Sequence, residues 1–77
     1  MITLKQVHKA MVQAGFADSQ LVKGDGYFYF CPADSVVGTH WLEDLDTTSV
    51  MVPRLNDLSI DQWVQEIRDL HKEAMGQ

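Results

Sequence analysis

The sequence contains a single cysteine, only two prolines and no long hydrophobic run among its 77 residues. One cysteine excludes an intrachain disulfide and a zinc site built on paired cysteines. No stretch approaches the roughly 20 apolar residues that a transmembrane helix needs. Residues 1–13 have no apolar segment behind a basic head, so we expect no signal peptide. A lone thiol without a bridge suits a reducing compartment, and we expect a cytoplasmic protein.

Basic residues are scarce as well. Six Lys and Arg stand against 11 Asp and Glu, which gives a formal net charge of −5. Residues 24–46 hold five of the acidic residues and no Lys or Arg. Contact with a phosphate backbone requires clustered basic side chains, so we expect no direct binding of nucleic acid.

The length fits one small domain, residues 1–77. Hydrophobic residues make up 45% of the chain and charged residues 22%, which are ordinary values for a folded globular domain. A domain of this size buries only roughly 60–65% of the surface that its unfolded chain exposes. We therefore expect a small core and a modest margin of stability.

Apolar spacing predicts a helix over residues 3–14. Thr3 and Gln6 have the spacing of a capping box, in which each side chain bonds a free backbone N–H near the other. Gly15 suits the left-handed position that ends a helix, and the following Phe16 is placed to cover its last turn.

A second helix is predicted over residues 59–75, and it begins with the same pattern. Ser59 and Gln62 form a second capping box, and Asp61 suits the positive end of the helix dipole. One apolar stripe runs along this helix: Ile60, Trp63, Val64, Ile67, Leu70 and Ala74.

The middle of the chain favours strands at residues 19–23, 27–31 and 47–53. Residues 24–26 read Gly-Asp-Gly, which is typical of a hairpin turn. Pro53 lacks an N–H, so it should end its strand or lie on an edge. The simplest arrangement is an α+β fold, in which an antiparallel sheet of two to three strands carries both helices on one face.

Residues 32–46 form a long acidic loop or a partly structured insertion. The stretch 39–45 could be a helical turn or an edge strand. Residues 27–30 are four consecutive aromatics, and alternate rings in a strand point to opposite faces. One face should pack under the helices. The other is covered by residues 32–46, with Trp41 as the candidate cover, or it is an open contact surface.

We expect no enzymatic site, no cofactor and no metal. Cys31 closes an aromatic strand, which is typical of a small buried hydrophobe. His8 and His71 lie on polar sides or ends of the helices, where a histidine that is solvated or that pairs with the helix dipole is normal. The only local cluster of ligand-type residues is His40 with Glu43 and Asp44, and its spacing matches no known metal motif.

Two runs, GDGYFYF at 24–30 and TTSVMVPRLNDLSIDQW at 47–63, give the chain a resemblance to a family of small uncharacterised bacterial proteins, often found in prophages and other mobile elements. The resemblance covers roughly residues 14–68. It implies no particular activity, cofactor or catalytic residue. It implies a context in which small proteins often act by binding a host protein.

The sequence therefore predicts a protein-interaction module that binds a protein partner or a second copy of itself. A second hypothesis is an acidic inhibitor that competes for a nucleic-acid-binding site on a host defence or replication protein. The residues predicted to contact the partner are Tyr27, Tyr29, His40, Trp41, Glu43, Asp44 and Asp46.

Overall fold

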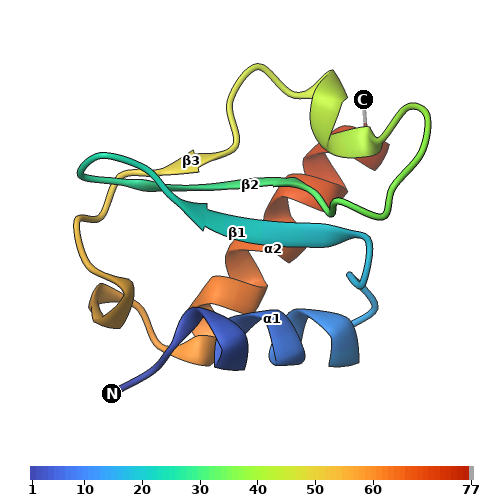
Figure 1. Ribbon diagram of the computed structural model, residues 1–77. Helices are drawn as coiled ribbons and strands as arrows, with labels where there is room; N and C mark the ends of the chain where they lie inside the picture. The colour runs from blue at the N-terminus through green and yellow to red at the C-terminus, as the bar shows by residue number, and fades with distance from the viewer. Residues whose placement is uncertain (77) are drawn as a thin grey trace.

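A computed structural model describes residues 1–76 and confirms the α+β fold, with two helices on one side of a three-stranded antiparallel sheet (Figure 1). In chain order the elements are α1 (Leu4–Gln13), β1 (Ser19–Lys23), β2 (Phe28–Pro32), the 3₁₀ helix η1 (Trp41–Asp44), β3 (Ser49–Val50), the 3₁₀ helix η2 (Leu55–Asp57) and α2 (Ile60–Met75).

The strands lie in the order β1-β2-β3, with β2 in the centre. A two-residue turn, Asp25–Gly26, joins β1 to β2, and Gly24 N–H donates to Tyr27 O across it at 2.8 Å. Gly26 has φ +81° while Asp25 keeps a negative φ. Only the second central residue of the turn therefore occupies the left-handed region, where glycine is favoured. The predicted hairpin is confirmed.

The third strand is much shorter than the predicted one. Only Ser49 and Val50 belong to β3, and the strand prediction over 47–53 is wrong for most of its length. Val52 N–H donates to Val50 O at 2.9 Å, so the chain turns away directly after the strand. The central strand runs from Phe28 to Pro32, one residue later than predicted.

Both capping boxes form as predicted, at Thr3 with Gln6 and at Ser59 with Gln62. The end of α1 is a complete Schellman motif. Phe16 N–H donates to Met11 O at 2.8 Å, and Gly15 has φ +95°. Because this motif turns Phe16 back over the last turn of α1, its ring joins Met11 in the core.

The core lies between the helices and the inner face of the sheet. Trp63 of α2 is fully buried, with its ring edge-on to Phe28 at 5.3 Å between centroids. Its indole N–H donates to Leu55 O at 2.9 Å, so the largest core side chain leaves no polar atom unpaired. The buried hydrophobic residues are Val7, Met11, Phe16, Leu21, Phe28, Phe30, Leu42, Trp63 and Ile67.

The segment 32–46 is partly structured. Its stretch 39–45 is predicted to form a helical turn or an edge strand, and the helical turn forms, as η1. Leu42 enters the core. The ring of Trp41 lies 4.8 Å from that of His71 on α2 and 6.3 Å from that of Phe16. Trp41 and Leu42 of η1 therefore pack on the helix side of the sheet, and Figure 1 shows η1 beside α2. Val37, in the same segment, is exposed.

Candidate functional site

The structure separates the seven predicted contact residues into two groups. Tyr27 and Tyr29 belong to the hairpin and the central strand, on the side of the sheet away from the helices. The other five lie in or beside η1, and they differ in exposure: His40, Trp41, Glu43, Asp44 and Asp46. The structure therefore does not bring the predicted residues together in one patch.

The sheet register defines the first surface. Cross-strand partners share a face, and Tyr29 pairs with Val22 on one side and with Ser49 on the other. The opposite pairs, such as Leu21 with Phe30, face the core. We use the name outer face for the side without helices, formed by Gln20, Val22, Tyr27, Tyr29, Cys31 and Ser49.

The two tyrosines are the largest side chains of the outer face. Their rings lie 6.0 Å apart between centroids, and both residues are half-buried. The ring of Tyr27 also lies over Gly24, so closely that a Cβ added to Gly24 would be 2.5 Å from Tyr27 Cζ. Gly24 has no positive φ, so this glycine makes room for a ring rather than for a turn. The tyrosine pair therefore depends on a glycine across the hairpin.

Acidic residues flank the outer face at both ends. Asp25 is exposed at the hairpin tip. At the opposite end, Gln20 Nε2 donates to Pro32 O at 3.2 Å and lies 3.5 Å from Asp34 Oδ1. Cys31, a free and half-buried thiol, pairs across the strands with Gln20. The outer face thus combines an aromatic centre with carboxylates at its rim.

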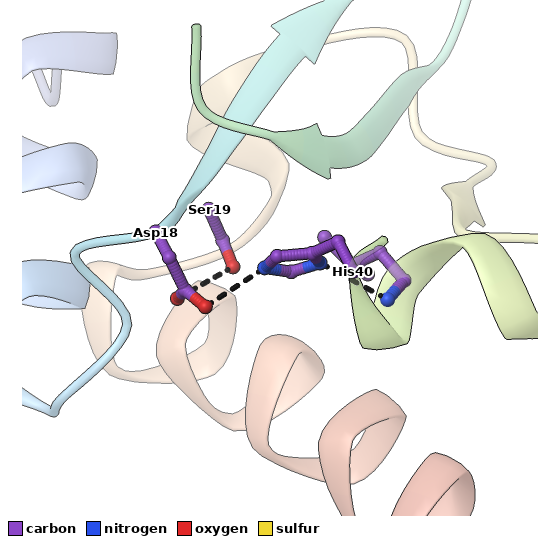
Figure 2. Close-up of polar contacts among 4 residues, drawn as sticks. Asp18, Ser19 and His40 are labelled. Carbon is purple, nitrogen blue, oxygen red and sulfur yellow. Dashed lines mark hydrogen bonds and ion pairs between the residues drawn. The ribbon is translucent and has the colours of Figure 1, made fainter. Parts of the chain in front are cut away.

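A polar cluster joins the start of β1 to η1, with His40 and Ser19 buried and Asp18 exposed. Figure 2 shows His40 between Asp18 and the backbone of η1. Leu42 N–H donates to His40 Nδ1 at 3.1 Å, so this nitrogen is the unprotonated one. The other nitrogen, Nε2, donates to Asp18 Oδ2 at 2.8 Å. The histidine side chain is only 4% exposed, so it ties residue 18 to the segment 32–46 from inside the fold.

This cluster contains Ser, His and Asp, but it lacks the geometry of a catalytic triad. In a triad, one imidazole nitrogen bonds the carboxylate and the other receives the serine proton. Here the second nitrogen of His40 already accepts the Leu42 N–H. Ser19 Oγ lies 3.4 Å from Asp18 Oδ1 and so bonds the carboxylate instead (Figure 2). The arrangement can cap η1 and anchor a loop, and it leaves no base for a nucleophile.

The histidine of α1 has a role that the sequence pattern did not indicate. His8 Nε2 lies 3.0 Å from both the N–H and the carbonyl oxygen of Leu21 in β1. These two backbone groups point away from β2, toward the open edge of the sheet. The side chain therefore closes part of an edge that another strand could otherwise join. The expectation of a solvated His8 is wrong.

His71 is not a solvated surface residue either. It is half-buried, with its ring edge-on to Phe16 at 5.5 Å and to Trp41 at 4.8 Å. The acidic residues beside η1 differ from these histidines, because Glu43, Asp44 and Asp46 are exposed. Within residues 1–76 none of the three forms an ion pair.

In the described part of the chain, no three His, Cys, Asp or Glu side chains lie close enough to hold a metal ion. Over the same residues, no helix combines the length and the apolar character needed to cross a bilayer. Comparison of the chain with protein-family models, curated proteins and solved structures gives no match.

Proposed function

We propose that this chain is a non-enzymatic protein-interaction module that binds a basic surface of a partner protein through its outer face. The observation that carries the proposal is the tyrosine pair, half-buried on the side of the sheet away from both helices. Tyrosine is common at protein interfaces because its ring buries apolar area while its hydroxyl keeps a hydrogen bond.

Charge favours a basic partner over a second copy of the chain. Asp25 and Asp34 stand at the two ends of the outer face, and the whole chain carries −5. Two copies that met through this face would bring like charges together, which opposes association. A partner with Lys and Arg around an apolar centre would match both the rim and the tyrosines.

The non-enzymatic part of the proposal rests on the chemistry of the side chains. Among residues 1–76, the one histidine–carboxylate pair, His40 with Asp18, has both imidazole nitrogens engaged within the fold. The lone thiol lies on the outer face, where it pairs with Gln20. A cytoplasmic location and a mobile-element context, in which the partner is a host protein, belong to the same proposal.

The test is a comparison of three forms of the chain as bait in an extract of cells that carry the gene. The forms are the wild type, the double variant Tyr27→Ala/Tyr29→Ala and the control Val12→Ala. Val12 is 55% exposed on α1, so the control removes apolar surface elsewhere. A partner that is captured is then purified and titrated with each form.

The double variant should lose at least roughly 30-fold in affinity, as expected when central aromatic contacts are removed from an interface. The control should bind like the wild type. Affinity should also fall as salt rises, because exposed rim charges are screened. Equal binding by all three forms, or a wild-type dimer that buries the tyrosines, would contradict the proposal.

One observation favours the second candidate, an acidic inhibitor of a nucleic-acid-binding protein. Glu43, Asp44 and Asp46 are all exposed and carry no internal counter-ions among residues 1–76. If η1 is the contact, the triple variant Glu43→Gln/Asp44→Asn/Asp46→Asn should weaken binding while the tyrosine variant does not. DNA or RNA should then compete with the chain for its partner.

A further inference from the structure

A pocket with a volume of about 300 Å³ lies apart from the outer face, where the start of α1, the first residue of β2 and η2 meet. In Figure 1 this is the region between the N-terminus, the hairpin end of the sheet and the short helix before α2. Nine residues line it: Met1, Ile2, Leu4, Lys23, Phe28, Pro53, Arg54, Leu55 and Asn56.

The apolar part of the pocket is backed by the core. Phe28 is only 2% exposed, and its ring is held edge-on by Trp63. Ile2, Leu4 and Leu55 also pack against the core cluster. Because these side chains are fixed by packing on their far sides, the apolar wall does not need a ligand to form.

The polar part consists of hydrogen-bond donors. Lys23 is the cross-strand partner of Phe28, which places its stem beside the pocket wall. Asn56 Oδ1 accepts the Ile2 N–H at 3.2 Å, so its NH₂ group is left to donate. Together with Arg54, these side chains offer two positive charges and an amide donor. No acidic residue lines the pocket, although Asp and Glu outnumber Lys and Arg in the chain.

The guanidinium of Arg54 remains open to a ligand. Its nearest carboxylate is Asp57 Oδ1 at 3.6 Å, and the arginine side chain is 82% exposed. An exposed pair of this length contributes little binding energy. A guanidinium has five N–H donors, so a ligand can be bound without breaking this contact.

We propose that this pocket binds a small amphipathic carboxylate, with an aliphatic tail along Phe28 and the carboxylate between Lys23 and Arg54. The volume is at the lower limit of the roughly 300–1,000 Å³ typical of small-molecule sites, which favours a short chain over a large cofactor. The pocket offers an apolar wall together with the positively charged donors of Lys23 and Arg54 and no carboxylate, and this combination favours an anionic ligand with an apolar tail. This site is independent of the outer face.

Octanoate is the probe for the first experiment, with octanol and octylamine as matched ligands of the same tail. Each is titrated into the isotope-labelled chain and followed by two-dimensional amide spectra. Octanoate should shift the signals of Ile2, Lys23, Phe28 and Leu55 and should saturate. Octanol should bind more weakly, and octylamine more weakly still, because the pocket repels a cation.

Variants locate the charge contribution. Lys23→Gln and Arg54→Gln should each weaken octanoate binding by roughly three- to tenfold, as expected for loss of one exposed charge-assisted hydrogen bond. Arg68→Gln is the control, since Arg68 is exposed and does not line the pocket. All three positions are exposed, so the variants should fold, which their own spectra verify.

Three results would overturn the proposal. The first is octanol or octylamine binding as tightly as octanoate. The second is a set of shifted signals that lies outside the pocket, and the third is the absence of saturable shifts at millimolar octanoate. None of these results bears on the outer face, so the proposal that the outer face binds a partner protein is tested independently.

Discussion

Replacing His40 with alanine should destabilise the whole domain, although the residue lies in a segment that resembles a loop. The change removes a side chain that is 4% exposed, together with its bonds to Asp18 and to Leu42 N–H. Leu42 is itself only 3% exposed, so its N–H would lose its partner where water has little access. The substitution therefore acts on the packing of η1 against α2.

The magnitude follows from these contacts. An unpaired buried N–H costs about 1–3 kcal/mol. The bond to Asp18 contributes less than a buried ion pair, about 1 kcal/mol, because that carboxylate is 48% exposed and partly screened. The sum is about 2–4 kcal/mol, a large part of the roughly 4–12 kcal/mol expected for a domain of this length. The melting temperature should fall by roughly 12–25 °C.

The measurement is urea and thermal unfolding followed by circular dichroism, with two companion variants. His40→Asn retains an acceptor for Leu42 N–H, so it should lose less than His40→Ala. Asp18→Asn should cost about 1 kcal/mol alone and almost nothing in the His40→Ala background, since the two residues share one bond. A loss below about 0.5 kcal/mol for His40→Ala would refute the reasoning, because η1 would then be held without this cluster.

Three further predictions test other contacts. Gly24→Ala should displace the ring of Tyr27, because the new Cβ would lie 2.5 Å from Tyr27 Cζ. The ring can swing outward, so we expect a stability loss under about 1 kcal/mol together with loss of the nuclear Overhauser contacts between the two tyrosine rings. Unchanged contacts would contradict the geometry. Trp63→Phe should lower the free energy of unfolding by about 2–3 kcal/mol, because it leaves a cavity and an unpaired Leu55 carbonyl; a loss below about 1 kcal/mol in urea unfolding would be inconsistent with a fully buried indole. Ser59→Ala should cost about 1 kcal/mol in the same assay, and Ser59→Asn should restore most of it, since both Ser and Asn cap a helix; equal losses for the two would argue against the cap.

The parts of the fold that could be predicted are those fixed by local chemistry. The capping boxes at Thr3 and Ser59 each depend on one residue three positions later in the chain. The hairpin turn depends on the positive φ of Gly26. Such features are visible in a short window of sequence. The structure confirms these features.

The length of β3 could not be predicted, because it is set by another strand. Val50 pairs with Phe28, the first residue of β2, so Met51 would already face the hairpin turn. No partner strand exists beyond that point, whatever the β-propensity of residues 51–53. Propensity describes the segment, whereas strand length depends on its neighbour.

The polar contacts at the candidate sites were hidden for the same reason. The nearest acidic residues to His40 in sequence are Glu43 and Asp44, yet its partner is Asp18, 22 positions earlier. Likewise, the position of His8 on the polar side of α1 predicts a solvated side chain, but the edge of β1 lies against His8. Only the packing of distant elements decides which donor meets which acceptor.

The shortness of β3 and the availability of the outer face have one origin. β3 pairs with Phe28 and Tyr29, and Thr48 extends the contact to Phe30 through its carbonyl oxygen and its hydroxyl, so the pairing ends before the last two residues of β2. At this end of the sheet, η1 closes the helix side of the core with Leu42, while Trp41 packs against His71 of α2. The apolar residues of η1 are thereby committed to the helix side. They are not available to cover Tyr27 and Tyr29, and this is the arrangement that the proposed interaction through the outer face requires.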